Sequence, residues 1–371
     1  MPHNSLSFGI EEEFFLVDLV TRDIPPQPPA ALLDAYRQTF GTQLAAEMFQ
    51  SQIEVVSPIL HDLGEADVWL RDSRGKLAGQ AGEFGLGVLG AAAHPFADWR
   101  EQRPTDSEHY RQLFADYRDI AQRSLVSGLH VHVGVPEGCD RVRVMNRVLG
   151  WLPLLLALSC SSPFWGGRDT GLASHRRTLC GEWPRMGIPE HLPDDTALAA
   201  YVDLLLATGA LRRRGDLWWF IRPSARFATL ELRITDACPA VDDVLCIAGL
   251  FRALVSWALE AQYTADAELQ RLVLEENYWR ARRHGSAARF LDAEGHGELD
   301  ASTWLERLER QLGDHGEAQT FDRARQILRD GNSADRQRRV LLQAVENGVE
   351  ARQALMRVVD SLLEETAARS A

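Results

Sequence analysis

Residues Phe8-Gly9-Ile10-Glu11-Glu12-Glu13-Phe14-Phe15-Leu16-Val17 place three adjacent carboxylates inside an otherwise apolar segment. In an extended chain, successive side chains point to opposite faces. Glu11 and Glu13 therefore share one face of a predicted strand, while Glu12 lies on the other face among apolar side chains. Two like charges on a half-buried strand repel each other and are costly to desolvate. We expect a cation against the face of Glu11 and Glu13, and a buried partner for Glu12.

Three further segments have the same pattern of one apolar and one polar face. Alternation predicts strands over 48–58, 125–135 and 229–234, the last paired with 217–222 around a turn that contains Pro223. Their polar faces carry Glu54, His130, His132, Glu231 and Arg233. These four strand segments contain no lysine, although a solvated strand face would favour it. The pattern indicates a sheet whose polar face lines a functional site.

The rest of the chain is mainly helical by periodicity. We predict helices over 30–39, 62–81, 107–124, 141–161, 194–208, 241–262, 269–283, 304–312, 319–329 and from 335 to the end, the final one over 349–365. Short strands separated by helices indicate an α+β fold with a mainly antiparallel sheet, helices on one face and an open concave site on the other. We expect one domain over 1–371, with a sheet-forming core at about 5–290 and a helical segment at about 300–368.

The stretch Gly85-Leu-Gly87-Val-Leu-Gly90 matches the glycine pattern of a dinucleotide-binding loop. That fingerprint requires a strand before it and a helix after it. Here a predicted helix precedes the glycines and a loop follows them. We therefore interpret the stretch as a close-packed strand.

Composition limits the class of protein. The net charge is -13, which argues against a nucleic-acid binder with its basic surface. The five cysteines have no Cys-x-x-Cys spacing, and the N-terminus has no signal-peptide pattern, so we expect a cytoplasmic location. The apolar run at 151–160 is too short to span a bilayer and predicts a buried helix.

The clustered carboxylates favour a hard dication, because Mg²⁺ is usually held by a few carboxylates and the phosphates of a substrate. Zn²⁺ on His130 and His132 is the competing metal. A second cluster is cationic and contains Arg222, Arg226, Arg233, Arg280, Arg282 and Arg283. Forked guanidinium groups suit phosphates and carboxylates.

Several blocks of the sequence resemble one family, the YbdK-like carboxylate–amine ligases, also called type 2 glutamate–cysteine ligases. The blocks are Gly9-Ile-Glu-Glu-Glu-Phe, Gly128-Leu-His-Val-His-Val-Gly134, Leu154-Leu-Leu-Ala-Leu-Ser, Ser162-Pro-Phe-Trp, Asp169-Thr-Gly, Trp219-Phe-Ile-Arg-Pro-Ser224, Thr229-Leu-Glu-Leu-Arg233 and Glu276-Asn-Tyr-Trp-Arg-Ala-Arg-Arg-His-Gly285. They run from about residue 8 to residue 285 in the order of the family.

The resemblance implies a glutamine-synthetase-like catalytic fold with a curved sheet around a Mg·ATP (or Mn·ATP) and amino-acid site. It implies ATP-dependent amide formation through an acyl phosphate, with weak glutamate–cysteine ligase activity, and a homodimer. The implied metal ligands are Glu11, Glu13, Glu54, His132 and Glu231. The implied catalytic residues are Arg233, Arg222 and Glu54, and the implied substrate or ATP contacts are Arg222, Arg233, His130, Asn277 and Arg280.

Two departures from the family bear on substrate identity: Ala92-Ala-His-Pro95 replaces Gly-Thr-His-Pro, and Ser159-Cys-Ser-Ser-Pro163 replaces Ser-Ala-Asn-Ser-Pro. Two other functions stay open at this point. A Zn²⁺ hydrolase would use His130, His132 and Glu54, and a non-catalytic protein on the same fold would bind nucleotide without turning it over.

Overall fold

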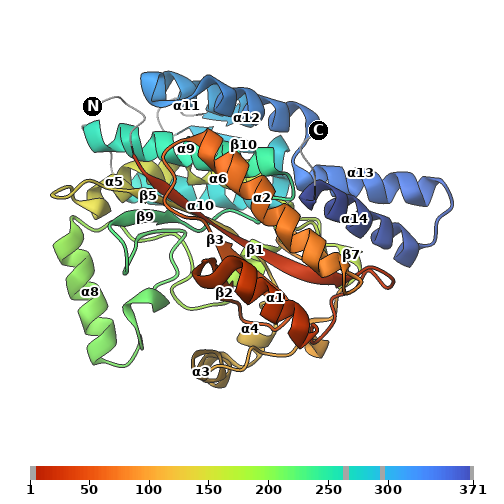
Figure 1. The fold of residues 1–371 in the computed structure, drawn as a ribbon. Coiled ribbons are helices and arrows are strands. Elements are labelled where there is room, and N and C mark those ends of the chain that lie inside the picture. Colours follow the sequence, from red (N-terminus) through yellow and green to blue (C-terminus); the bar gives the residue numbers. More distant parts are fainter. Residues whose placement is uncertain (1–5, 262–266, 293–296, 368–371) are drawn as a thin grey trace.

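Strand β1 (Phe8–Asp18) is the hub of a seven-stranded antiparallel sheet in the computed structural model, which describes residues 6–261, 267–292 and 297–367 (Figure 1). The strands lie in the order β2-β3-β1-β5-β9-β8, and β4 pairs with β1 off this path. The other strands of the sheet are β2 (Leu44–Ala46), β3 (Gln52–Val56), β4 (Leu86–Leu89), β5 (Leu129–Gly134), β8 (Ile221–Pro223) and β9 (Thr229–Leu232). The predicted α+β fold with an antiparallel sheet is confirmed.

Strand β1 is long enough to have three partners. One edge pairs with β3, while the other edge pairs first with β5, through residues 8–12, and then with β4, through residues 15–18. The two halves of β1 therefore have different surroundings.

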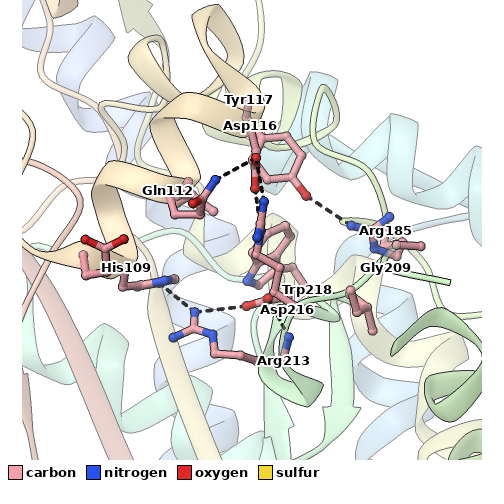
Figure 2. Close-up of a pocket in the computed structure, with 14 residues that line it drawn as sticks. His109, Gln112, Asp116, Tyr117, Arg185, Gly209, Arg213, Asp216 and Trp218 are labelled. Atoms are coloured by element: carbon pink, nitrogen blue, oxygen red, sulfur yellow. Dashed lines mark hydrogen bonds and ion pairs between the residues drawn. The ribbon is translucent and has the colours of Figure 1, made fainter. Parts of the chain in front are cut away.

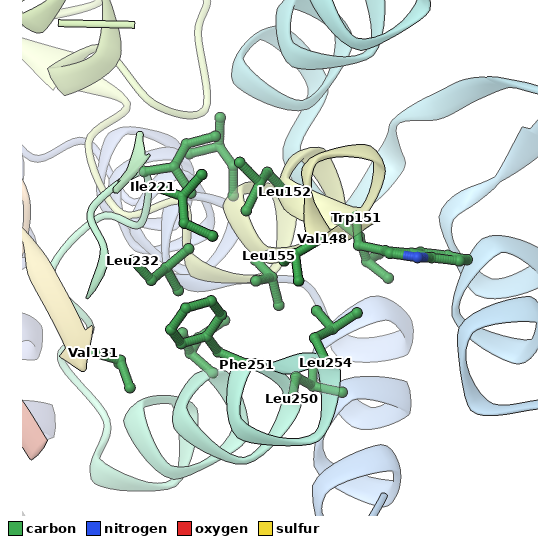
Figure 3. Packing of buried hydrophobic residues seen from close by; sticks show 14 of the residues in the cluster. Val131, Val148, Trp151, Leu152, Leu155, Ile221, Leu232, Leu250, Phe251 and Leu254 are labelled. Atoms are coloured by element: carbon green, nitrogen blue, oxygen red, sulfur yellow. The ribbon is translucent and has the colours of Figure 1, made fainter. Parts of the chain in front are cut away.

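The helices that cover the apolar face of the sheet come from several parts of the chain. They are α1 (Ala30–Phe40), α2 (Leu63–Gly82), α5 (Arg141–Val148), α6 (Leu152–Ser159) and α9 (Val241–Glu260). Figure 3 shows how Val131 and Leu232 of the sheet face Leu155 of α6 and Phe251 of α9. By length and composition, 141–159 could cross a membrane, but 83% of that stretch is buried inside the protein, as the predicted core helix should be.

The second half of β1 is buried on both faces. Phe14 and Leu16 pack against α1 and α2, whereas Phe15 and Val17 pack against α14 (Ala351–Thr366). The polar face is thus open only over the first half of the strand. Gly87 of β4 lies under α14, where an added Cβ would come within 2.9 Å of Leu363, so this glycine serves close packing as predicted.

The remaining helices are α3 (Glu108–Tyr117), α4 (Asp119–Gln122), α7 (Arg176–Cys180), α8 (Asp195–Ala207), α10 (Ala267–His284), α11 (Ala301–Leu312), α12 (Ala318–Asp330) and α13 (Ser333–Glu346). Short 3₁₀ turns occupy 41–43, 99–101, 149–151, 214–216, 285–287 and 313–315. Asp194 accepts a hydrogen bond from the backbone N–H of Ala197 and begins α8, as predicted.

Several predicted elements needed correction. The helix predicted over 107–124 is two helices, because Arg118 adopts a φ of 44° between α3 and α4. The helix predicted over 141–161 has a 3₁₀ turn just before Pro153. The stretch predicted to be helical from 335 is α13 and α14, separated near Gly348, whose φ is 76°, and α14 corresponds to the final helix predicted over 349–365. The predicted end at Gln262 lies outside the described residues.

The strand predicted over 217–222 is also shorter than expected. Only 221–223 pair with β9, since the N–H of Phe220 donates to the carbonyl of Gly187 instead of continuing the ladder. Two short hairpins were missed: β6 (Phe164–Trp165) with β7 (Arg168–Asp169), and β10 (Arg289–Asp292) with β11 (Gly297–Asp300).

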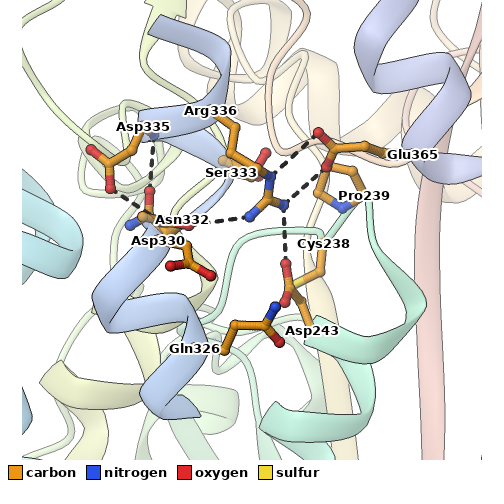
Figure 4. Close-up of polar contacts among 12 residues, drawn as sticks. Cys238, Pro239, Asp243, Gln326, Asp330, Asn332, Ser333, Asp335, Arg336 and Glu365 are labelled. Carbon is orange, nitrogen blue, oxygen red and sulfur yellow. Dashed lines mark hydrogen bonds and ion pairs between the residues drawn. The ribbon is translucent and has the colours of Figure 1, made fainter. Parts of the chain in front are cut away.

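The C-terminal helices attach to the sheet-forming core at two places. Helices α11 and α12 pack on α6 and α9, while α13 and α14 pack on each other and α14 packs on β4. Arg336 of α13 links the second pair to the core, because its guanidinium donates to Glu365 of α14 and to Asp243 of α9 (Figure 4).

Candidate active site

The strand register aligns the polar side chains in one row across the sheet. The directly opposed residues are Glu13 with Glu54, Glu11 with His130, His132 with Glu231, and Glu231 with Arg222. Opposed residues of antiparallel strands point to the same face. The alternation in the sequence therefore predicted the polar face correctly.

Glu11 lies between the two histidines of β5. Its carboxylate oxygens are 3.2 Å from Nδ1 of His130 and 3.1 Å from Nε2 of His132. Burial raises the pKa of Glu11, but hydrogen bonds from His130 and then His132 outweigh it, so its pKa falls well below the usual range. Burial, followed by the charge of Arg233, lowers the pKa of His130 to about 4. Glu11 is therefore a carboxylate beside the neutral imidazole of His130 at neutral pH.

Glu231 is held between two arginines. Arg222 donates to it through Nε at 2.8 Å and Nη2 at 3.1 Å, and Arg233 forms a second ion pair with it. Burial opposes ionisation of Glu231, but the charges of Arg233 and Arg222 outweigh it and lower its pKa. The Nη1 of Arg222 donates to the carbonyls of Gly215 and Leu217. The guanidinium of Arg222 thus fixes Glu231, whereas Arg233 lines the pocket beside it.

Three carboxylates gather at one end of this row: Glu13 and Glu54, which belong to it, and Glu47 beside them. Burial, and then the charge of Glu47, raises the pKa of Glu13 to about 8. The same two causes raise the pKa of Glu54, and burial raises that of Glu47. The backbone N–H of Gly128 donates to Glu13 at 2.6 Å. Carboxylates this crowded hold protons unless a cation neutralises them.

One pocket of about 230 Å³ opens over part of this row, and His132, Arg222 and Glu231 do not line it. Its lining includes Glu11, Glu13, Glu47, Glu54, His130, Arg176, Arg177, Trp183, Trp218 and Arg233. A second pocket of about 400 Å³ adjoins it and shares His109, Leu113 and Trp218 with it (Figure 2). The second pocket therefore extends the cavity beyond the row of polar side chains.

Sequence reasoning missed Glu47, Arg176 and Arg177. Glu47 follows the three-residue strand β2, which has no periodicity to detect, and both arginines lie on the five-residue helix α7. Arg176 donates to the carbonyl of Thr235 at 2.9 Å and helps to lower the pKa of Glu13, although burial and Glu47 outweigh it. One sequence signal could have revealed the two arginines: they are consecutive, and no acidic residue lies near them in the segment.

Asn277 and Arg280 do not line the pocket. The side-chain amide of Asn277 donates to the carbonyl of Leu291 at 3.0 Å and accepts from the N–H of Leu291 at 2.6 Å. These two hydrogen bonds hold β10 on α10. Arg280 pairs with Glu276 at 2.7 Å and with Glu298 at 2.8 Å. Both residues support the β10–β11 hairpin, and the structure does not bring them to the predicted substrate site.

The partner expected for Glu12 is Arg74 of α2. Its Nε donates to Glu12 at 3.2 Å and its Nη2 donates to the other carboxylate oxygen. The side chains are 4% and 2% exposed, so this ion pair is buried. Arg74 lies between Leu70 and Leu77 on the apolar stripe of its helix, which was the unused sequence signal.

One group of side chains fits a metal ion. One ligand atom each from Glu11, His132 and Glu231 lie within 4.8 Å of one another. The Nδ1 of His132 is 2.9 Å from the hydroxyl of Thr229, while its buried Nε2 has no well-aligned hydrogen bond. A hydrogen bond at Nδ1 leaves Nε2 as the ligand atom. His130 and Glu54 do not belong to this group, which weakens the zinc-hydrolase alternative.

The departures from the family pattern lie in supporting positions. The hydroxyls and backbone of Ser159, Ser161 and Ser162 hydrogen-bond with the buried Asp236, which lies 3.9 Å from Arg176. His94 bonds with the backbone carbonyl of Arg22. Neither segment lines the pocket.

Comparison with known proteins shows which proteins this chain resembles. A family model described as glutamate–cysteine ligase family 2 matches residues 7–361. A protein of Pseudomonas entomophila (strain L48), provisionally named glutamate–cysteine ligase 2, is 50% identical over 363 residues, which cover 97% of this chain and 95% of the relative.

Solved structures share the fold at low sequence identity. The glutamate–cysteine ligase of Francisella tularensis in complex with AMP superposes with a TM-score of 0.70 at 11% identity, over 98% of this chain and 89% of that one. A bifunctional glutathione synthetase of Pasteurella multocida gives a TM-score of 0.69 at 15% identity. The superposition covers 98% of this chain and 53% of that longer chain.

Proposed function

The chain belongs to glutamate–cysteine ligase family 2, and from this premise we propose that it is an ATP-dependent carboxylate–amine ligase that forms an amide bond through an acyl phosphate. The observation that carries the proposal is the cluster of four carboxylates, Glu11, Glu13, Glu47 and Glu54, that lines one pocket together with Arg233. Joining a carboxylate to an amine is uphill in water, so the acid must first be activated by phosphoryl transfer.

Phosphoryl transfer needs positioning and neutralisation of charge more than covalent help from the protein. Bound Mg²⁺ (or Mn²⁺) would supply charge neutralisation at the phosphates of ATP. Glu11, His132 and Glu231 would hold one such ion, because their ligand atoms converge. Glu13 and Glu54, with Glu47, are the candidates for a further cation, since they line one pocket and their pKa values are raised by burial and, for Glu13 and Glu54, next by the charge of Glu47.

Arg233 is the residue placed to stabilise the transferring phosphoryl group, because it lines the pocket next to Glu231. Arg222 acts through Glu231 and is a positioning residue, since its Nε, Nη1 and Nη2 all donate to Glu231, Gly215 and Leu217 and it does not line the pocket. His130 separates Glu11 from Glu13 and keeps a neutral imidazole in the pocket.

Glutamate and cysteine are the substrates proposed from the names of the family and its members. We also propose that the chain forms a single catalytic domain, that it works as a homodimer, and that it is cytoplasmic. Sedimentation analysis of the purified protein would check the dimer.

The test is an ADP-release screen over pairs of amino acids with Mg²⁺ and ATP, followed by mass analysis of the product. A ligase releases ADP only when both an acid and an amine are present, and the product mass equals their sum minus water. Tightly held stoichiometric Zn²⁺ with ATP-independent hydrolysis would overturn the proposal. Nucleotide binding without ADP release for any pair would indicate the non-catalytic alternative.

A further inference from the structure

Helix α3 lines both cavities of the site, yet it packs loosely on the rest of the protein. We call the cavity of about 230 Å³ the catalytic pocket and the adjoining cavity of about 400 Å³ the outer pocket. His109 and Leu113 of α3 line both of them. The structure describes all ten residues of α3, and none of them is fully buried. A segment with so few buried contacts opens at a lower free-energy cost than the core of a protein.

The chain has a strained joint at the end of α3. Arg118 has a φ of 44° and a ψ of -114°, a backbone conformation that residues with a Cβ rarely adopt. At the other end, Ser107 caps the helix by accepting from the N–H of Tyr110 at 3.3 Å, so α3 keeps its shape as a unit. Residues at the end of an element often absorb the backbone rotation of a hinge motion. Arg118 is therefore placed to act as the hinge of a rigid α3.

Two contacts join α3 to the arginines of residues 212–213, which also line the outer pocket (Figure 2). Asp116 accepts from Nε of Arg212 at 2.8 Å and from its Nη2 at 3.0 Å. His109 accepts from Nη2 of Arg213 at 2.8 Å. The side chain of Arg212 is 59% exposed, and exposed ion pairs contribute little stability and are screened by salt. These two contacts, which we call the latch, can therefore break and form again at a small cost in free energy.

We propose that α3 is a hinged lid over the catalytic pocket, which opens to exchange substrates and, when the latch is formed, keeps water away from the acyl phosphate. This inference rests on the proposed function and deepens it, since it explains how the hydrolysis of ATP stays coupled to the formation of the amide. The competing interpretation is that α3 is a fixed wall of the two pockets, and the experiment separates the two.

The acyl phosphate makes water a competitor of the amine. Either nucleophile adds its lone pair to the acyl carbon, the bond from that carbon to the phosphate oxygen breaks, and phosphate leaves with the bonding electrons while the nucleophile loses a proton to the solvent. The amine gives the amide, whereas water regenerates the acid. Closing a site excludes water and suppresses such hydrolysis. An open lid should therefore be detected as ADP release without amide.

Asp116→Asn and Arg212→Met each remove the ion pair of the latch. In the intact protein, with Mg²⁺, ATP and the acid found by the ADP-release screen but no amine, we expect ADP release to rise about two- to fivefold over the wild type, which is the factor that corresponds to loss of an exposed ion pair. With both substrates present, the ratio of ADP to amide should rise above the wild-type ratio. The double variant Asp116→Arg with Arg212→Asp exchanges the two charges and should restore that ratio.

Arg111→Met is the matched control, because Arg111 lies on α3 but pairs with Asp106 at 3.0 Å and with Glu108 at 3.1 Å, on its own side of the outer pocket. It should leave the ratio of ADP to amide unchanged. An unchanged ratio in both latch variants would overturn the proposal. An equal rise in Arg111→Met would also overturn it, since the effect would then come from the charge of α3 and not from the latch.

Hydrogen exchange without ligands gives a readout that does not depend on turnover. The backbone amides of 108–117 should exchange about two- to fivefold faster in Arg212→Met than in the wild type, while those of β5 exchange at the same rate in both. Equal exchange of α3 in the two proteins would show that the helix is a fixed wall and would overturn the proposal.

The two readouts together separate this inference from the ligase proposal. If the wild type releases no ADP for any pair of amino acids but Arg212→Met quickens exchange in α3 alone, the ligase proposal fails and the hinged helix stands. If the wild type ligates amino acids and the latch variants change neither the ratio of ADP to amide nor the exchange of α3, the ligase proposal stands and the lid fails.

Discussion

Glu11 and Glu12 are neighbours in sequence with opposite surroundings, so the same substitution should have opposite consequences at the two positions. Glu12→Gln leaves Arg74 buried without its charge partner, and breaking a buried ion pair costs about 3–5 kcal/mol. We expect the free energy of unfolding in urea to fall by about that amount, while the folded fraction keeps its ADP release.

Glu11→Gln is the matched control for this prediction. It lies on the pocket side of β1, so it should abolish most ADP release and change the free energy of unfolding by much less. A loss of activity without a loss of stability in Glu12→Gln would contradict the assignment of the two faces.

At the residue scale, the sequence predicted which face of its strand each polar side chain occupies, because this follows from alternation. The facing of Glu11, Glu13 and Glu54 follows from the period of a strand, and so does the separation of Glu12. The sequence could not predict that Arg177 lines the pocket, because α7 has only five residues and its position over the sheet is set by tertiary contacts.

At the scale of elements, Arg336 is one of several links between the α13–α14 pair and the rest of the protein. Arg336 reaches Glu365 at 2.9 Å and Asp243 at 3.2 Å, so it joins α13, α14 and α9 (Figure 4). Arg336→Met should lower the free energy of unfolding by about 1–3 kcal/mol, because two carboxylates lose a charged donor. Hydrogen exchange should quicken first in α13 and α14.

Arg357→Met on the exposed side of α14 is the control and should leave hydrogen exchange unchanged. If hydrogen exchange in Arg336→Met quickened equally in the strands of the sheet, then the contact made by Arg336 would not stabilise α13 and α14 independently of the sheet.

The wrong predictions of individual elements have one physical cause in common. Tertiary contacts outweigh the structure that the local sequence pattern favours. The periodicity of 107–124 is helical throughout, but Arg118 takes a left-handed φ that turns the chain. The apolar run of 217–220 looks like a strand, yet Phe220 bonds to Gly187 outside the sheet. Hairpin β10–β11 has only four residues in each strand, too few for an alternation to be recognised.

At the scale of the whole molecule, acid stability should depend on His94. Burial lowers the pKa of His94 from 6.5 to about 4, although the charge of Asp23 and the hydrogen bond to the carbonyl of Arg22 oppose this shift. The neutral ring is held in place because its Nδ1 accepts from the N–H of Phe96 and Ala97. A histidine whose pKa is lower in the folded state binds more protons when unfolded. Its contribution is therefore complete above about pH 6.5 and is lost as the pH falls towards 4.

The loss amounts to about 3 kcal/mol at pH 4, at about 1.4 kcal/mol for each pKa unit. His94→Asn keeps an acceptor near Nδ1 and does not titrate, so urea unfolding between pH 7 and pH 4 should give a flatter profile than the wild type. Parallel profiles for the two proteins would exclude His94 as the group responsible.

The whole architecture was better predicted than its details. One antiparallel sheet with an apolar and a polar face follows from four segments with the same alternation, and the shared fold of the solved relatives agrees with it. The attachment of α14 to the second half of β1 could not be predicted, because nothing in a helical period specifies which of two sheet faces the helix will cover.

The three partners of β1 also have a kinetic consequence. Its register joins residues 8–18 to segments near 54, 88 and 131, and the row of polar residues is complete only when residue 231 has joined. Contacts between residues so far apart in sequence give a high contact order. Folding is slowed because the entropy cost of closing the long loops must be met before these contacts can stabilise the structure. The catalytic pocket should therefore be among the last parts of the molecule to form, both in refolding and during synthesis on the ribosome.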